Sequence, residues 1–257
     1  MLVVLNFMKK SPYAIEHLRD KLASEKKLQK LKKTYSLKYL EIKDSNSAPF
    51  WNVKWSIYNG LQQQDSITKD RIRTTASFLP KTAKRILDIG IGHGWVEELI
   101  ENRDVELYGN DISDQAIKDV KRRFQGKFLT QSLYNLKYKK NFFDTIFLLE
   151  VLEHVPPSMT FKVLSDIRNI LKSQGYFILS VPTNEGLEHM FGNPNGHVRM
   201  YTIPLISAEL QLAGFKVIKL KTLYAFNKYY IFKKMIAKYL WKNHWHPNNI
   251  IILAQKI

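Results

Sequence analysis

The stretch Arg85-Ile-Leu-Asp-Ile-Gly-Ile-Gly-His-Gly-Trp95 decides the fold of this 257-residue chain. Its first residues predict a short buried β-strand, and the alternating glycines that follow predict a tight turn. Such a turn leads into the first turn of a helix, where free backbone N–H groups can bind a ligand. We therefore expect a strand–turn–helix unit here, with a ligand bound at the turn.

The spacing of the glycines separates two classes of cofactor site. A dinucleotide fingerprint, G-x-G-x-x-G, would place its third glycine at the position of Trp95. Here the pattern is Asp88-x-Gly90-x-Gly92-x-Gly94, with an acidic residue two positions before the first glycine. A carboxylate repels phosphates and attracts an ammonium group. The pattern therefore favours a ligand with a cationic amino-acid head.

Alternating strands and helices are predicted from residue 84 to the end of the chain. Ser113 suits the N-cap of one helix, and Pro157 suits the first turn of another. The β–α alternation predicts a doubly wound α/β fold with a mostly parallel, seven-stranded sheet. The predicted strands are 85–89, 105–109, 127–130, 143–149, 176–181, 215–221 and 250–254, and the predicted helices are 95–102, 113–124, 157–172 and 207–212.

Residues 1–80 have a different pattern, and we expect them to form an N-terminal helical cap on a main domain over 81–257. A basic amphipathic helix is predicted over 13–33, a loop over 44–49 and a further helix over 62–79. The cap also contains a cluster of aromatic residues: Phe50, Trp51, Trp55 and Tyr58.

The start of the chain predicts neither secretion nor a membrane span. No stretch reaches the roughly 18 to 20 apolar residues that a membrane-spanning helix needs. The first apolar run, Met1–Met8, precedes Lys9 and Lys10, which is the reverse of the order in a secretory signal. We expect a cytoplasmic protein that could also bind peripherally to a membrane. Met8 is a second candidate start.

Charge is unevenly distributed along the chain, whose net charge is +17. Residues 1–85 carry 18 basic and 7 acidic side chains, residues 86–209 carry 13 and 16, and residues 210–257 carry 9 and none. The basic flanks indicate a surface for an acidic partner, although a general excess of lysine would give the same net charge without a function. The absence of cysteine excludes disulfides, Cys-ligated metals and thiolate nucleophiles.

With these residues the chain resembles the class I S-adenosylmethionine-dependent methyltransferases, in particular the small-molecule branch that includes quinone and sugar methyltransferases. The resemblance covers about 84–222 and the last strand. It implies that Asp88 and the loop glycines hold the methionine end of S-adenosylmethionine. It also implies that Asp111, with Ile112 beside it, binds the ribose hydroxyls, a task that suits a carboxylate because it accepts two hydrogen bonds.

Two further segments resemble cofactor-binding positions of the family. Gln131-Ser132-Leu133 follows the third strand, where the family usually has an acid, and Gln131 could donate a hydrogen bond to adenine. The fourth strand ends in Leu149-Glu150-Val-Leu-Glu-His154, similar to the family's V-L-E-H-V strand end. Glu150 is expected at the cofactor, because ligands bind at the carboxyl ends of strands in such sheets.

His154 and His197 are the candidate catalytic bases. Imidazole titrates near neutral pH and can accept a proton from a nucleophile. His197 lies in a segment similar to the family's H-V-R-x-Y-T pattern, in which Arg199 would bind an anion or form structural hydrogen bonds. An equal alternative for Glu153 and His154 is that they brace a loop. A three-histidine metal site has no supporting spacing, and we predict no metal.

Residues 223–246 are predicted to be an insertion between the last two strands. Aromatic residues and lysines alternate there, and there is no acidic residue. Three interpretations are open: a lid packed on the core, a surface for a bilayer interface or lipid-carrying substrate, and a less favoured stacking platform for single-stranded nucleic acid.

The resemblance implies methyl transfer from S-adenosylmethionine to a small-molecule acceptor, with oxygen favoured and a lipid- or glycan-linked acceptor as one option. The chain lacks the Asn/Asp-Pro-Pro-aromatic motif of amino-methylating nucleic-acid enzymes. The alternative is a non-catalytic module of the same fold that binds nucleic acid or an acidic partner through its basic flanks.

Overall fold

A computed structural model of the protein describes residues 46–58, 66–183, 196–199, 201–226, 229–240 and 247–257. The helix predicted over 13–33 lies outside these residues, as do parts of the loop and helix predictions that flank it.

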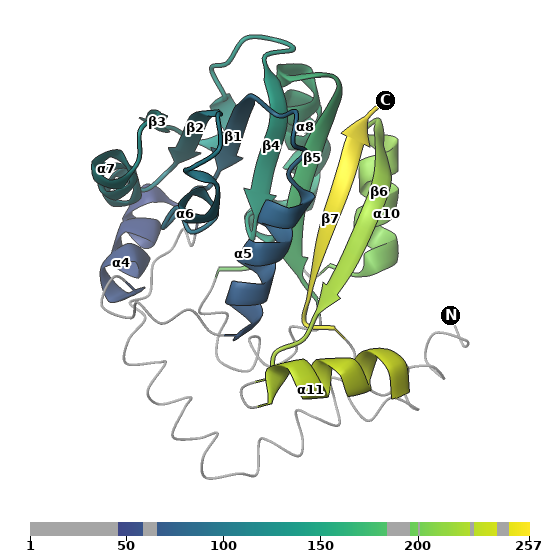
Figure 1. Ribbon diagram of the computed structural model, residues 1–257. Helices are drawn as coiled ribbons and strands as arrows, with labels where there is room; N and C mark the ends of the chain where they lie inside the picture. The colour runs from purple at the N-terminus through teal and green to yellow at the C-terminus, as the bar shows by residue number, and fades with distance from the viewer. Residues whose placement is uncertain (1–45, 59–65, 184–195, 200, 227–228, 241–246) are drawn as a thin grey trace.

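A seven-stranded sheet with the order β3-β2-β1-β4-β5-β7-β6 forms the centre of the molecule (Figure 1). Neighbours from β3 through β5 pair in parallel, whereas β7 runs antiparallel between β5 and β6. The mostly parallel sheet that the sequence predicts is confirmed. The strands are β1 (Arg85–Ile89), β2 (Glu106–Asp111), β3 (Lys127–Thr130), β4 (Phe143–Leu149), β5 (Leu171–Pro182), β6 (Phe215–Leu223) and β7 (Asn249–Lys256).

Helices cover both faces of the sheet, as expected for a doubly wound fold (Figure 1). Two hydrophobic cores lie on opposite faces, because the side chains of each strand alternate between them. One core includes residues of α5 (Ser66–Phe78), α6 (Glu97–Ile100) and α7 (Asp114–Arg123), and the other includes residues of α8 (Pro157–Ile170) and α10 (Ile203–Leu212).

Capping residues set the starts of two helices. Ser113 accepts a hydrogen bond from the backbone N–H of Ala116 at 3.2 Å, so the predicted cap of α7 is confirmed. Thr202 accepts one from Leu205 N at 3.3 Å. Because of this cap, α10 begins at Ile203, earlier than the predicted start at residue 207.

Several other predicted boundaries are wrong. Residues 48 and 49 are not in a loop, because α4 (Ala48–Tyr58) begins there with Pro49 in its first turn, where its missing N–H costs nothing. The helix predicted over 95–102 is only the four-residue α6. The helix predicted over 157–172 ends at Ile170, because β5 begins at Leu171, five residues before the predicted start at residue 176.

The carboxyl ends of the parallel strands lie together at the lower end of the sheet in Figure 1. The glycine turn follows β1, Asp111 ends β2, and Glu150 follows β4. The topology therefore brings the predicted site residues to one edge. Within the described ranges no helix combines the length and apolar character needed to cross a membrane.

Candidate active site

The glycine loop has a backbone that only glycine adopts without strain. Gly90 and Gly94 have φ angles of +76° and +65°. A Cβ atom on Gly90 would lie 2.5 Å from Val151 Cγ2, and one on Gly94 would lie 2.7 Å from Phe124 Cε2. Both glycines are therefore required by packing as well as by conformation.

Gly92 has a different role. Its φ is +51°, yet a Cβ atom there would meet no atom of the described chain closer than 3.9 Å. The backbone at Gly92 thus borders open space, which leaves room for a ligand to approach it.

Asp111 connects the end of β2 to this loop. Its Oδ2 atom accepts a hydrogen bond from Gly92 N at 3.0 Å, and its Oδ1 atom accepts one from Ser113 N at 2.8 Å. Burial raises the pKa of this carboxyl group, although the backbone donors oppose the shift. Each carboxylate oxygen has a second lone pair, so the group can still accept ribose hydroxyls.

Asp88 is buried and shares a side-chain hydrogen bond with Glu97, the first residue of α6. Burial and the neighbouring carboxylate raise the pKa of Asp88, and burial raises the pKa of Glu97 to about 7. Asp88 Oδ1 has no hydrogen-bond partner within the described chain. A buried acceptor of this kind suits the ammonium group of a methionine-like ligand.

Glu97 was not predicted from the sequence. Two adjacent glutamates at a helix start look like ordinary acids that stabilise the helix dipole. Of the two, only Glu98 is an exposed acid of this kind, and its carboxylate pairs with Arg123. Glu97 is 1% exposed.

Helix α4 lies against three parts of the site. Its Trp55 ring stacks on the ring of His93 in the glycine loop at a centroid distance of 3.9 Å. The Trp95 ring also stacks on His93, at a centroid distance of 4.7 Å. Asn52 donates a hydrogen bond to Asp114 at 2.9 Å. At the other side of the site, the Trp51 ring packs edge-on against His154 at 4.8 Å. Of the predicted aromatic cluster, Trp51 and Trp55 border the site directly.

The residues after β3 lie beside Asp111. Gln131 N donates to Asp111 O at 3.0 Å, and the Ser132 hydroxyl caps a short helical turn by accepting from Tyr134 N at 3.2 Å. Leu133 packs against a hydrophobic core. Ile112 lies between Asp111 and the helix cap, partly buried. Cofactor contacts by these side chains stay predictions.

Glu150 belongs to a network that holds strand ends together. It has a positive φ of 57°, and its carboxylate accepts hydrogen bonds from Ser180 at 2.6 Å and from Asn249 at 2.7 and 2.8 Å. Arg71 of α5 forms an ion pair with it at 3.2 Å. These partners orient the carboxylate at the carboxyl end of β4, and its predicted cofactor contact stays a prediction.

The two candidate bases lie together with Glu153. The rings of His154 and His197 are 4.7 Å apart, and His197 Nε2 lies 4.0 Å from Glu153 Oε1. His154 Nδ1 is 3.2 Å from the carbonyl oxygen of Gly196. Because a carbonyl oxygen only accepts, Nδ1 carries the proton and Nε2 carries the lone pair. Burial lowers the pKa of His154 to about 3, so this imidazole is neutral at physiological pH.

This cluster also has the composition of a metal-binding group. One ligand atom from each of Glu153, His154 and His197 can be chosen so that all three lie within 4.8 Å of one another. The structure thus combines two histidines and a carboxylate, which differs from the three-histidine set considered from the sequence.

Arg199 is part of a structural network. Its guanidinium donates to Thr160 Oγ1 at 2.9 Å and pairs with the buried carboxylate of Glu209, which also accepts from Tyr201. Of its two predicted roles, the described contacts support structural hydrogen bonding.

Comparison with known proteins identifies the family. Residues 62–220 match the family described as "Methyltransferase domain". The chain belongs to this methyltransferase family. A structure of an S-adenosylmethionine-dependent methyltransferase from Archaeoglobus fulgidus has a TM-score of 0.63 at 19% identity, over 79% of this chain and 99% of that chain.

Two curated relatives match part of the methyltransferase. A ubiquinone biosynthesis O-methyltransferase of Cereibacter sphaeroides is 31% identical over 151 residues, 53% of this chain and 60% of that protein. The cyclopropane-fatty-acyl-phospholipid synthase of Escherichia coli is 26% identical over 133 residues, 51% of this chain and 35% of the synthase. The matches thus cover less than two thirds of either relative.

The domain is an S-adenosylmethionine-dependent methyltransferase, and its glycine loop fits this cofactor. The open backbone at Gly92, the buried acceptor on Asp88 and the carboxylate of Asp111 are suited to its amino-acid and ribose parts. When bound, the cofactor supplies a methyl group that its sulfonium has already activated. The protein's residues need to orient the acceptor, exclude water and accept a proton.

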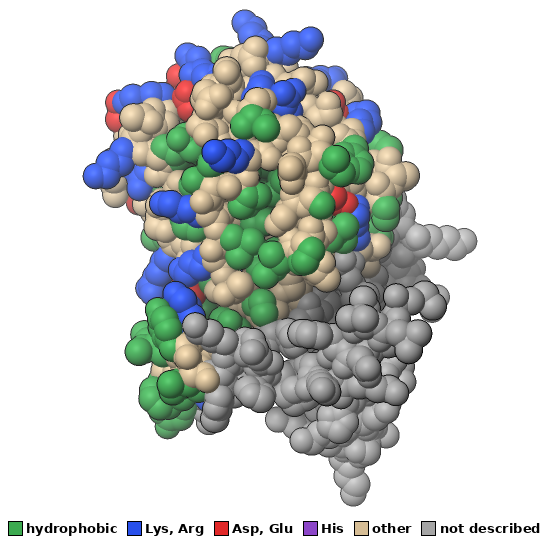
Figure 2. Space-filling view, turned by 90° about the vertical axis from the view of Figure 1, so that its right-hand side faces the viewer, with side chains coloured by type: hydrophobic (Ala, Val, Ile, Leu, Met, Phe, Trp, Pro, Cys, Tyr) green, Lys and Arg blue, Asp and Glu red, His purple; other side chains and the backbone are tan. Residues whose placement is uncertain are grey.

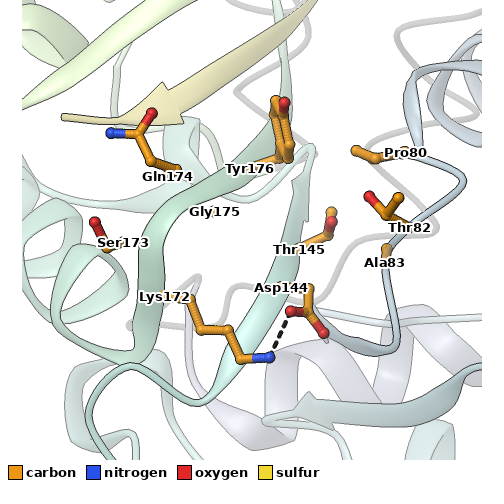
Figure 3. A pocket seen from close by; sticks show the side chains of 10 residues that line it. All are labelled: Pro80, Thr82, Ala83, Asp144, Thr145, Lys172, Ser173, Gln174, Gly175 and Tyr176. Atoms are coloured by element: carbon orange, nitrogen blue, oxygen red, sulfur yellow. Dashed lines mark hydrogen bonds and ion pairs between the residues drawn. The ribbon is translucent and has the colours of Figure 1, made fainter.

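A pocket lies at the opposite end of the strands (Figure 3). Its walls include Asp144 at the start of β4 and Lys172 near the start of β5, which form an ion pair at 2.5 Å. Asp144 also accepts from the backbone N–H groups of Lys84 and Arg85. Because its charged groups are mutually bonded and far from the glycine loop, we assign this pocket no part in methyl transfer.

The Asp88–Glu97 pair predicts a pH-dependent stability. A carboxyl group whose pKa rises on folding stabilises the protein at low pH, and this contribution is lost as the pH rises through its folded-state value. For Glu97 that value is about 7, so we expect a loss of ~3 kcal/mol in unfolding free energy between pH 5 and pH 8.5. Glu97→Gln should reduce this loss, as measured by urea unfolding at several pH values. Glu98→Gln is the matched control and should keep it; equal slopes in all three proteins would contradict the assignment.

Proposed function

We propose that the methyltransferase methylates a hydroxyl oxygen of a small-molecule acceptor. The observation that supports this most is the cluster of Glu153, His154 and His197 at the carboxyl end of β4. A hydroxyl is a weak nucleophile until a base removes its proton, so a base at this edge suits an oxygen acceptor. The similarity to a ubiquinone biosynthesis O-methyltransferase points the same way.

Within the cluster we assign the base to His197. The Glu153 carboxylate, 4.0 Å from His197 Nε2, would stabilise the imidazolium formed when His197 accepts the proton. His154 is a poor proton acceptor, because its pKa is lowered to about 3. Its Nδ1–H bond to Gly196 instead holds its ring beside that of His197. His154 is therefore a positioning residue.

A lipid-linked acceptor is the more specific form of the proposal. The Escherichia coli relative is named for a fatty-acyl phospholipid, which supports an apolar substrate. The non-catalytic alternative has less support, because the glycine loop and Asp111 keep the geometry that a cofactor site needs.

His197→Asn should lower the rate of methyl transfer by about 10²- to 10⁴-fold, the usual contribution of a general base. The affinity for S-adenosylhomocysteine should not change, because the contacts that place His197 are with Glu153 and His154 and not with the glycine loop. His154→Asn is the matched variant and should lower the rate less. Transfer would be measured to phenol and catechol acceptors with and without a long alkyl chain, and O-methyl products identified by mass spectrometry and NMR.

Three results would contradict this assignment. Methylation at nitrogen or carbon would exclude the oxygen acceptor, and a larger loss in His154→Asn would reverse the roles of the two histidines. Activity that a chelator abolishes and a divalent metal restores would show that the cluster acts as a metal site.

A further inference from the structure

The segment after β6 is a helix whose apolar face points away from the protein. α11 (Tyr230–Met235) continues directly into a π-helical turn, η3 (Ile236–Leu240). Six large apolar side chains on it or next to it have exposed fractions from 55% for Met235 to 78% for the preceding Tyr229, whereas Ile236 is partly buried. The exposed set is Tyr229, Ile231, Phe232, Met235, Tyr239 and Leu240, which we call the α11 apolar face.

The opposite side of this helix contacts the domain through polar groups. Tyr230 donates a hydrogen bond from its hydroxyl to Asp70 Oδ2 at 2.7 Å, and Lys234 forms an ion pair with the same carboxylate. Lys221 of β6 binds the other oxygen of Asp70 at 3.1 Å. These cations and the hydroxyl lower the pKa of Asp70, despite its partial burial. The contacts of Tyr230 and Lys234 with Asp70 thus hold the helix on the domain, and the α11 apolar face points to the solvent.

Within the described part of the insertion, which excludes 227–228 and 241–246, this orientation of α11 does not fit a lid packed on the core. A lid packed on the core would bury its aromatic rings, and Tyr224 is indeed buried. Phe232 and Tyr239 are instead 66% and 60% exposed. Exposed apolar side chains in such number on one helix cost solubility and indicate a contact surface.

The positive charge near the α11 apolar face indicates an anionic partner. Residues 210–257 contain nine lysines and no acidic residue. Lys238 is exposed and lies 5.1 Å from the centroid of the Tyr239 ring, and Lys233 lies 6.0 Å from that of Phe226. Figure 2 shows hydrophobic side chains at the lower left, where α11 lies, with Lys and Arg side chains above them. Lysines beside aliphatic and aromatic groups match the headgroups and acyl region of an anionic bilayer.

The position of the helix relates this surface to the active site. β6 runs parallel to β5, because both pair antiparallel with β7. α11 therefore follows the carboxyl end of a strand, at the same end of the sheet as the glycine loop (Figure 1).

We propose that the α11 apolar face docks the methyltransferase onto the surface of an anionic phospholipid bilayer. The aliphatic members Ile231, Met235 and Leu240 favour lipid over single-stranded nucleic acid, because bases stack on aromatic rings. Docking in this way turns the catalytic end of the sheet toward the bilayer. The docking surface itself does not depend on which atom the enzyme methylates.

Co-sedimentation with vesicles tests the proposal. The full-length protein should bind vesicles of phosphatidylcholine containing phosphatidylglycerol, and bind pure phosphatidylcholine much less. The variant Ile231→Ser/Phe232→Ser/Met235→Ser should partition at least tenfold less, with unchanged thermal stability and cofactor affinity. Leu212→Ser is the matched control, because Leu212 of α10 is 76% exposed at another place and should not affect binding.

Vesicle binding by Asp70→Asn distinguishes docking through the anchored α11 helix from a general electrostatic attraction to anionic lipid. The variant gains one unit of net positive charge, so attraction by charge alone predicts tighter binding to anionic vesicles. Anchored docking predicts weaker binding, because the helix loses the carboxylate that Tyr230 and Lys234 hold.

Each of the following results would overturn the proposal. The triple variant could sediment with vesicles as the unchanged protein does, or it could lose thermal stability, which would show that the face is covered within the chain. A change from dimer to monomer in the triple variant would show that a second copy covers it. Binding of single-stranded DNA that the triple variant loses, without vesicle binding by the unchanged protein, would assign the face to nucleic acid.

Discussion

Asp111→Ala is expected to weaken the binding of S-adenosylhomocysteine by at least about 100-fold. Hydrogen bonds to a charged group contribute ~1.5–3 kcal/mol each, and the carboxylate is assigned to the ribose hydroxyls. Two such bonds give ~3 kcal/mol or more, and ~1.4 kcal/mol corresponds to a factor of ten in affinity. The same change removes the acceptor for Gly92 N, which holds the loop against β2.

Isothermal titration calorimetry of the full-length protein would measure this loss. Asp114→Ala is the matched control, because Asp114 is in the same strand–helix junction and its carboxylate binds Asn52 and Lys118 instead. We expect its affinity to stay within about threefold of the unchanged protein, since surface pairs contribute little. Equal affinities in Asp111→Ala and the unchanged protein would contradict the cofactor assignment, provided that both remain folded.

Most of the fold could be predicted because its signals are local. β1, β3 and β4 begin and end at the predicted residues, since each is a short apolar run between turn-forming or charged residues. The starts of α4 and α10 were missed because Pro49 and Thr202 act as first-turn and cap residues within stretches that otherwise resemble loops.

The cofactor loop could be predicted for the same reason, because its glycines and Asp111 lie within one strand–turn–helix–strand unit. Residues that reach the site only through tertiary packing could not be predicted. Glu97 resembles a helix-dipole acid until its burial against Asp88 is known. The main partner of Glu150 is Asn249, 99 positions away, and no local pattern connects the two.

Replacing Arg199 by Ala is expected to cost about 3–5 kcal/mol of unfolding free energy, the largest stability effect we expect outside the cofactor loop. Arg199 pairs with Glu209, whose side chain is only 6% exposed. The variant leaves a buried carboxylate without its cation and also removes a donor to Thr160. Desolvation of an unpaired charge costs much more than the pair itself contributes. Urea unfolding of the full-length protein measures the change.

A double variant distinguishes this cause from a simple loss of packing. Arg199→Met/Glu209→Gln removes both charges and keeps similar side-chain volumes, so it should recover much of the stability lost in Arg199→Ala. Arg122→Ala is the exposed control, because its pair with Asp119 lies at the surface and should contribute less than about 1 kcal/mol. If the double variant is no more stable than Arg199→Ala, the unpaired charge is not the cause. If instead Arg199→Ala unfolds like Arg122→Ala, the Arg199–Glu209 pair does not stabilise the segment that carries His197.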